Sequence, residues 1–144
     1  MSVFVDTGVF YAHHDRDVPG HVSATNALEH LVSGRHGRLY TSDYVYDETV
    51  TLARTRTGRS DDAKAVGDGI RGADPYPDTI ELLHLTEELF GRSILLFERY
   101  DDHALSFTDA STVALTEYHG IDRVLSFDED FDGLVDRLDP TEVV

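Results

Sequence analysis

A short apolar run that ends on a single carboxylate constrains the fold of this chain more than any other feature. Residues 3–5 (Val-Phe-Val) are apolar and mostly β-branched, and Asp6 follows them directly. This pattern predicts a buried strand, a turn at Thr7-Gly8 and a helical segment from about Val9. In open α/β sheets, ligands collect at the carboxyl ends of strands, and a carboxylate there is costly unless it meets a positive partner. Asp6 therefore predicts a site at this edge of a sheet.

Strand-like and helix-like patterns alternate along the rest of the chain, and this predicts a mainly parallel sheet with helices on both faces. We expect one domain over residues 1–144, an α/β/α sandwich of three layers around four to five strands. Further strands are predicted at 39–41, 80–85, 123–126 and near 135–138, and helices at 21–33, from Ser42 or Asp43 to about Thr57, from Ser60, at 87–100 and at 106–119. The predicted caps of three of these helices are Ser42 or Asp43, Ser60 and Thr86. Residues 67–77 are rich in glycine and proline and predict a mobile loop.

The composition is strongly acidic, with 12 Lys and Arg against 28 Asp and Glu and a formal net charge of −16. Lys64 is the only lysine. Such a surface is typical of proteins from organisms with molar intracellular salt, and an acidic partner-binding surface is the alternative. The absence of cysteine excludes disulfides and thiolate metal sites. No apolar window approaches membrane-spanning length, so we expect a soluble, cytoplasmic protein without a membrane partner.

The basic side chains gather in one part of the sequence. Residues 1–72 carry 8 basic and 10 acidic side chains, whereas residues 73–144 carry 4 and 18. A cluster of cations is the place where a polyanion such as RNA would bind, and solvated helix positions are the alternative. The cluster consists of Arg54, Arg56, Arg59, Lys64 and Arg71.

Glu48 lies on the apolar stripe of its predicted helix. Val45, Glu48, Leu52 and Thr55 follow one another at spacings of 3, 4 and 3 residues, which places them on one face. An inward glutamate can pair with an arginine such as Arg54 or Arg56, or it can face the same cavity as Asp6. The sequence leaves both interpretations open.

Four acidic residues lie near predicted strand exits or helix starts: Asp6, Glu48, Asp109 and Asp128. Parallel strands all exit at one edge, so these carboxylates could converge, and Mg²⁺ or Mn²⁺ would relieve their repulsion. Such a cluster suits phosphodiester cleavage by a metal-activated water. Each acid also has a simpler interpretation. Asp109 completes a capping box with Ser106, and the Asp128 to Asp130 segment forms an acidic turn.

Taken in order, the segments VDTGVFYA, YDETVTLAR, SFTDASTVAL and VLSFDEDFD resemble the PIN domain family, and especially its VapC-type toxins. The resemblance covers essentially the whole chain. It implies that Asp6, Glu48, Asp109 and Asp128 bind metal, with Asp130 able to replace or assist the fourth acid. The hydroxyls that support the site in the family fall on Thr7, Ser106 and Thr108.

The resemblance implies an endoribonuclease that uses Mg²⁺ or Mn²⁺, the toxin of a toxin–antitoxin pair. It also implies an RNA substrate, a small cognate antitoxin and a homodimer. The alternatives are a PIN nuclease of ribosomal RNA maturation or RNA decay without an antitoxin, and a PIN-fold binding module that does not cleave. Phosphatases of the haloacid dehalogenase type need an acid where Gly8 stands, and receiver domains need paired acids and a late lysine.

Overall fold

A parallel sheet of five strands forms the centre of the molecule. The structure, a computed structural model, describes residues 1–35 and 37–143, and within them the strand order is β3-β2-β1-β4-β5. All four pairings are parallel, which confirms the predicted mainly parallel sheet. The strands are β1 (Ser2–Val5), β2 (Arg38–Ser42), β3 (Ile80–Leu83), β4 (Arg123–Leu125) and β5 (Arg137–Leu138).

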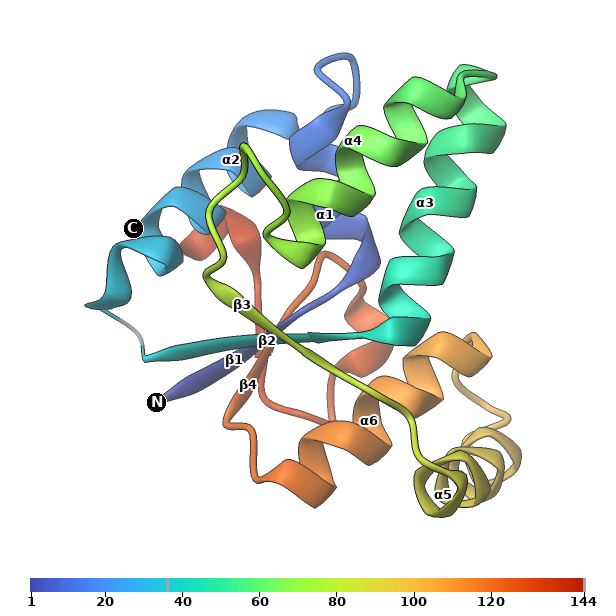
Figure 1. Cartoon of the computed structure of the whole chain (residues 1–144). Helices are drawn as coiled ribbons and strands as arrows, with labels where there is room; N and C mark the ends of the chain where they lie inside the picture. The colour runs from blue at the N-terminus through green and yellow to red at the C-terminus, as the bar shows by residue number, and fades with distance from the viewer. Residues whose placement is uncertain (36, 144) are drawn as a thin grey trace.

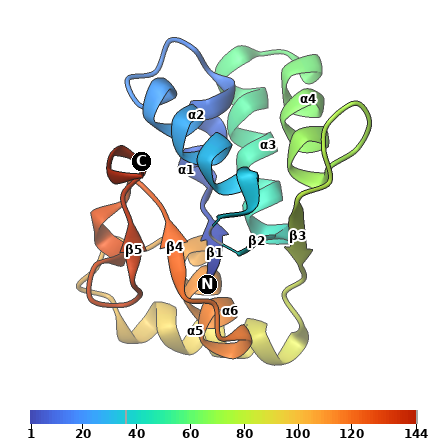
Figure 2. The same cartoon turned by 90° about the vertical axis from the view of Figure 1, so that its left-hand side faces the viewer.

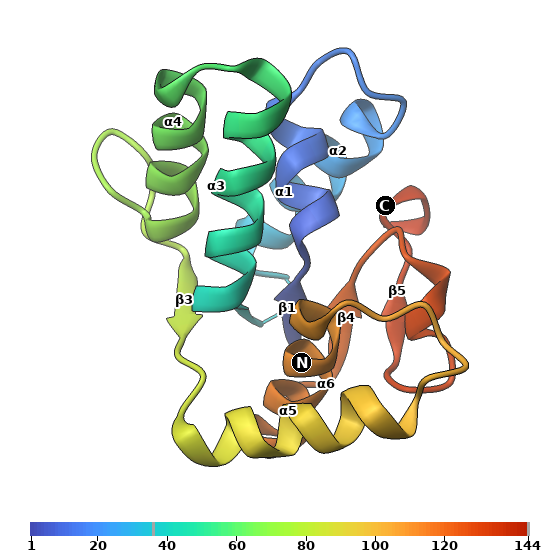
Figure 3. The same cartoon turned by 90° about the vertical axis from the view of Figure 1, so that its right-hand side faces the viewer.

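Helices cover both faces of this sheet, as the three-layer prediction requires. Figures 1, 2 and 3 show α1 to α4 packed together on one side of the strands, and α5 and α6 on the other. The longer helices are α1 (Thr7–His14), α2 (His21–His30), α3 (Asp43–Thr57), α4 (Ser60–Arg71), α5 (Glu87–Arg99) and α6 (Phe107–His119). No helix of the described residues is long and apolar enough to cross a membrane.

Strand β1 lies in the middle of the sheet, between β2 and β4. Val3, Phe4 and Val5 are fully buried, because the strand has a neighbour on each side and helices on each face. This burial explains the continuous apolar run, since a strand covered on both faces has no solvent side for polar residues. The central position carries the next residue, Asp6, to the middle of the carboxyl edge.

Side-chain caps fix the starts of the helices that frame this edge. Ser42 accepts a hydrogen bond from the amide of Val45 at 3.1 Å, and Thr86 accepts one from Leu89 at 3.3 Å. These hydroxyls satisfy amides that have no partner within the helix. Both caps were predicted, whereas the predicted cap at Ser60 is wrong by one residue. Arg59 is the cap there, without a side-chain bond.

The predicted loop at residues 67–77 is wrong over its first part, because α4 continues through Gly67 to Arg71. The reason lies in packing. A Cβ on Gly67 would lie 2.8 Å from the hydroxyl of Tyr46 and 3.0 Å from Cγ1 of Val50, so α3 and α4 approach more closely than a side chain allows. Gly67 therefore allows α4 to pack closely against α3 and does not interrupt the helix. The helix ends at Gly72, whose φ is 65°.

Candidate active site

Four carboxylates from four separate segments line one cavity of about 410 Å³ at the carboxyl edge of the sheet. Asp6 follows β1, Asp128 lies three residues after the end of β4, Glu48 projects from α3 and Asp109 from the first turn of α6. The structure thus brings together all four acids singled out in the sequence. Because the contributing segments are far apart in the chain, only the complete sheet assembles them.

Asp6 is buried, with 6% of its surface exposed. One carboxylate oxygen, Oδ2, accepts a hydrogen bond of 2.7 Å from the hydroxyl of Ser126. The other oxygen, Oδ1, is buried without any hydrogen-bond partner. Asp6 also stands at the cap position of α1, yet its side chain makes no capping bond. A buried carboxylate oxygen that is left unpaired on a cavity wall is costly, and it fits a cation.

Asp109 both completes a helix capping box and lines the acid cavity. Its side chain accepts a hydrogen bond of 2.9 Å from the amide of Ser106, and its own amide donates to Ser106 Oγ at 3.1 Å. This is a complete capping box at the start of α6. The same carboxylate is only 8% exposed and lines the cavity. The cap therefore holds a carboxylate in place at the site.

The site is electrostatically unfavourable without a cation. Burial and, to a smaller extent, the nearby carboxylates of Asp109 and Glu48 together raise the pKa of Asp6 to about 7, while the hydrogen bond from Ser126 opposes the shift. Burial also raises the pKa of Asp109 to about 6, against the hydrogen bonds from Ser106. Carboxyls that hold their protons this strongly lack a positive neighbour, and a divalent ion would supply one.

Ser126 is a site residue that the sequence analysis missed. Its hydroxyl donates to Asp6 and accepts a bond of 3.0 Å from the amide of Asp128, so it links two of the four acids. It is fully buried and lines the cavity. The available signal was its place immediately after a strand of the same sheet, the position that also distinguishes Asp6.

The supporting hydroxyls divide into two groups. Thr7 and Ser106 line the cavity, and the hydroxyl of Thr7 is buried without a hydrogen-bond partner. Thr108 does not line it, and its backbone carbonyl accepts a bond of 2.6 Å from Ser111. Thr7 and Ser106 are therefore the two predicted hydroxyls that lie at the site.

Asp128 and Asp130 also occupy different places. Asp128 lines the cavity, and its Oδ1 accepts a bond of 2.9 Å from the amide of Asp130. Asp130 does not line the cavity, and its carbonyl contacts the ring of His103 at 3.0 Å. By position Asp128 is the fourth acid of the site.

Glu48 faces the cavity and is half-buried. Within residues 1–35 and 37–143 it makes no ion pair, so neither Arg54 nor Arg56 neutralises it. Of the two interpretations left open by the sequence, the structure has the one in which Glu48 shares a cavity with Asp6.

The donor set fits a hard divalent ion, although the acids surround the cavity without closing on one point. Among the described residues, no three Asp, Glu or His side chains are gathered closely enough to hold a metal ion as they stand. Hydrogen bonds hold Asp6 to Ser126 and Asp109 to Ser106 in this arrangement. The unpaired oxygens of Asp6 and Thr7 are the positions a bound ion would satisfy.

The predicted cation cluster lies outside the acid cavity, and two of its members are paired with carboxylates. Arg59 contacts Asp61 at 3.1 Å and Asp62 at 3.5 Å, and Lys64 contacts Asp68 at 2.6 Å. In contrast, the guanidinium of Arg56 stacks on the ring of Tyr11. The cluster is thus no uniform basic patch.

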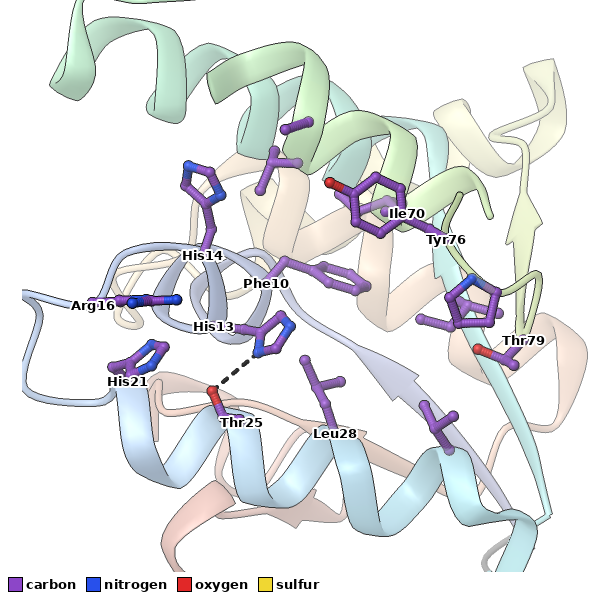
Figure 4. Close-up of a pocket in the computed structure, with 16 residues that line it drawn as sticks. Phe10, His13, His14, Arg16, His21, Thr25, Leu28, Ile70, Tyr76 and Thr79 are labelled. Carbon is purple, nitrogen blue, oxygen red and sulfur yellow. Dashed lines mark hydrogen bonds between the residues drawn. The ribbon is translucent and has the colours of Figure 1, made fainter. Parts of the chain in front are cut away.

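A separate cavity of about 500 Å³ is lined by residues of α1, α2 and α4 and of the segment before β3. Figure 4 shows an apolar floor that includes Phe10 and Leu28, and His14, Arg16 and His21 at one end. It shares no lining residue with the acid cavity. This cavity thus combines an apolar part with a part lined by histidine and arginine, and it contains none of the four acids of the candidate site.

Comparison with known proteins gives consistent relatives. The VapC ribonuclease of Archaeoglobus fulgidus is 23% identical over 132 residues, which are 91% of this chain and 80% of that protein. The crystal structure of VapC20 from Mycobacterium tuberculosis, a sarcin-ricin loop cleaving toxin, superposes with a TM-score of 0.75 at 29% identity and covers 90% of this chain and 92% of that one. The VapBC2 structure from Rickettsia felis, bound to promoter DNA, has a TM-score of 0.69 at 11% identity, over 96% and 98% of the two chains.

At 11% identity the last of these shows the fold alone. Comparison with models of protein families identifies the family: the model described as "PIN domain" matches residues 3–136 of this chain. That match spans nearly the whole chain and includes all four carboxylates of the cavity. The chain belongs to the PIN domain family.

Proposed function

We propose that this chain is a metal-dependent endoribonuclease of the VapC type, the toxin of a toxin–antitoxin pair. The observation that carries the proposal is Asp6, a buried carboxylate with one unpaired oxygen, in a cavity with three further acids. Its relatives include a VapC ribonuclease and a toxin that cleaves the sarcin-ricin loop, and they support RNA as the substrate.

Asp6, Glu48, Asp109 and Asp128 would hold Mg²⁺ or Mn²⁺, with Thr7 beside them. A role of Asp130 in the same site stays a prediction. When bound, the ion would activate a water and stabilise the leaving oxygen of a phosphodiester. Because all four ligands are carboxylates, the site would also exclude RNA phosphate whenever the ion is missing.

The chain's own residues prepare the site in two ways. Ser126 and the Ser106 cap fix the orientation of Asp6 and Asp109 through bonds of 2.7 to 3.1 Å. With a pKa of about 7, Asp6 is still partly protonated at neutral pH, whereas Asp109, with a pKa of about 6, is mostly ionised there, so a bound cation would displace a proton chiefly from Asp6. Ion binding would therefore release protons and draw the acids together.

The partners in this proposal are RNA, an antitoxin and a second copy of the chain, all in the cytoplasm. Solved structures with the same fold include a toxin–antitoxin complex from Klebsiella pneumoniae. An antitoxin arginine that reached Asp6, Asp109 and Asp128 would form strong charge-assisted hydrogen bonds in the cavity. It would occupy the position of the metal and so suppress cleavage.

The test is cleavage of mixed cellular RNA in concentrated potassium chloride, with Mg²⁺, Mn²⁺ or a chelator. Wild type should produce fragments only with metal, and Asp6→Asn should produce none. Asp47→Asn is the matched control, because Asp47 is exposed on α3 next to Glu48 and outside the cavity. No metal-dependent cleavage by antitoxin-free wild type would overturn the proposal in favour of a binding module.

A second measurement separates the toxin from a housekeeping nuclease. A short reading frame directly upstream, whose product copurifies with this chain and inhibits it, supports the toxin. Activity that no neighbouring product inhibits would favour a role in ribosomal RNA maturation or RNA decay.

A further inference from the structure

The acid cavity continues into a second cavity between α1 and α3, which we call the α1–α3 groove. This groove has a volume of about 270 Å³, and its lining includes Gly8, Tyr11, Gly20, Leu52, Arg56 and Phe127. Gly8, Leu52 and Phe127 line the acid cavity as well. A ligand that reaches the acids can therefore extend into the groove without leaving the protein surface.

Helical spacing lines up the two cavities. On α3, Glu48 faces the acid cavity, Leu52 lines both cavities, and Arg56 lines the groove. The three follow at intervals of four residues and so lie on one side of the helix. At 1.5 Å per residue, Arg56 stands about 12 Å along the helix from Glu48. The acid cavity and the α1–α3 groove thus form one continuous depression, acidic at Glu48 and basic at Arg56.

Arg56 is the one predicted RNA-binding cation that lines the groove. Its guanidinium lies 4.8 Å from the centre of the Tyr11 ring, and the hydroxyl of Tyr11 donates to Asp15 at 2.8 Å, which fixes that ring. Within the described residues Arg56 has no carboxylate within 4.0 Å, unlike Arg59. Stacking orients the guanidinium, one of whose N–H groups also hydrogen-bonds the Tyr11 hydroxyl. The remaining donors stay available for an anion.

The lining of the groove is otherwise largely aromatic and apolar. Phe127 packs so closely on Gly20 that a Cβ at Gly20 would lie 3.0 Å from the ring. Gly8 is different, since a Cβ there would meet no atom within 4 Å. Glycine weakens a helix relative to alanine, so the fold gives no reason for glycine at this position in α1. The empty space lies at the junction of the two cavities.

We infer that the α1–α3 groove holds the nucleotide next to the cleaved phosphodiester, with its unpaired base against Phe127 and a backbone phosphate on Arg56. The inference rests on the proposed function and adds the path of single-stranded RNA. Stacking on aromatic rings suits this protein, because a chain of net charge −16 repels RNA and salt screens its few cations. One oriented arginine and one fixed ring then supply local contacts that do not need a basic surface.

The first experiment measures RNA affinity and cleavage for Arg56→Gln. Affinity is measured by fluorescence anisotropy of a short, labelled, mixed-sequence single-stranded RNA with all four acids intact and with Ca²⁺ in place of Mn²⁺ to suppress cleavage, and kcat/KM is measured with Mn²⁺. Arg56→Gln should weaken both by about tenfold, as expected for one charge-assisted phosphate contact. Arg54→Gln is the matched control, because Arg54 is exposed on the same helix and lines neither cavity.

The second experiment fills the groove with Gly8→Leu. Since a Cβ at Gly8 would meet no atom within 4 Å, the variant should fold with an unchanged or higher melting temperature and should keep the stabilisation that Mn²⁺ gives to wild type. Its RNA affinity should fall by about tenfold or more. Loss of the Mn²⁺ response would mean that the leucine disturbs the acids, and it would count against the groove as a separate RNA site.

The outcomes distinguish the inference from the proposed function. If wild type cleaves RNA while the RNA affinities of Arg56→Gln and Gly8→Leu equal that of Arg54→Gln, the groove does not bind RNA. The proposed nuclease function is then unaffected. If wild type neither binds nor cleaves RNA, the proposed function fails. If the groove variants change the oligomeric state and leave RNA affinity intact, a second copy of the chain occupies the groove, and the inference is overturned.

Discussion

Replacing Asp6 by asparagine should stabilise the metal-free protein at neutral and alkaline pH while it abolishes cleavage. The burial and the neighbouring carboxylates that raise the pKa of Asp6 from its ordinary 3.8 to about 7 also make its charged form unfavourable in the folded state. At 1.36 kcal/mol per pKa unit, ionised Asp6 costs at most on the order of 4 kcal/mol.

Asparagine removes this cost but introduces a smaller one of its own. Its amide can still accept the hydrogen bond from Ser126, but its NH₂ group would meet the position where Asp6 Oδ1 has no partner. An unpaired buried donor costs about 1–3 kcal/mol. The net stabilisation above neutral pH should therefore be about 1–3 kcal/mol, or roughly 3–9 °C in melting temperature for a domain of this size.

The sign of the pH dependence follows from the direction of the shift. A carboxyl with a raised pKa binds its proton more tightly in the folded state, so its penalty is absent below about pH 4, grows with rising pH and is complete above about pH 7. In acid only the cost of the unpaired asparagine amide remains, so the advantage of Asp6→Asn over wild type should disappear there and turn into a small loss of stability. Asp109, with a pKa of about 6, adds a weaker dependence of the same sign to both proteins.

Thermal unfolding followed by circular dichroism, in chelator and at several pH values, measures this difference. The free energy of unfolding of Asp47→Asn should stay within about 0.5 kcal/mol of the wild-type value at every pH, because the Asp47 carboxylate is exposed. Added Mn²⁺ should stabilise wild type and leave Asp6→Asn largely unchanged. A lower melting temperature of metal-free Asp6→Asn above neutral pH, or a difference that does not change with pH, would refute the reasoning.

Three further outcomes follow from the site and the fold. Ser126→Ala should raise the pKa of Asp6 further, because it removes a hydrogen bond to the charged form, and NMR titration of the metal-free protein should detect the rise. Asp128→Asn should reduce metal-dependent cleavage by at least about tenfold and Asp130→Asn by far less; equal losses in both would show that the two share the role. Gly67→Val should destabilise the protein by about 1–3 kcal/mol in chemical denaturation, since α3 leaves no room for the side chain, and an unchanged midpoint would contradict the close packing.

Local patterns predicted much of the fold. The apolar run of β1, the parallel alternation and the caps at Ser42, Thr86 and Ser106 depend on residues close together in sequence, and all appear in the structure. Positions that depend on distant contacts were harder to predict. Gly67 signals a chain break by local statistics, and only the approach of α3 reveals that it permits a helix contact.

The site shows the same division. The positions of Asp6 and Asp109 at a strand exit and a helix start made them visible in the sequence. Ser126 forms hydrogen bonds to residues 120 positions before it and two positions after it. Its place after a strand was a signal, but that place alone does not reveal a bond to a residue so distant in sequence. Likewise, the cluster of cations looked uniform until the structure showed Arg59 and Lys64 paired with acids and Arg56 stacked on a ring.

The central place of β1 has a consequence for the order in which activity can arise during synthesis. This strand is made near the start of the chain, but one of its two neighbours, β4, spans residues 123–125, and the fourth acid comes at Asp128. A nascent chain that has not yet released these residues from the ribosome lacks both a sheet partner and a carboxylate of the cavity. A chain synthesised only as far as β4 therefore lacks the complete site of the proposed nuclease, and a partner can already be present when the active centre first forms.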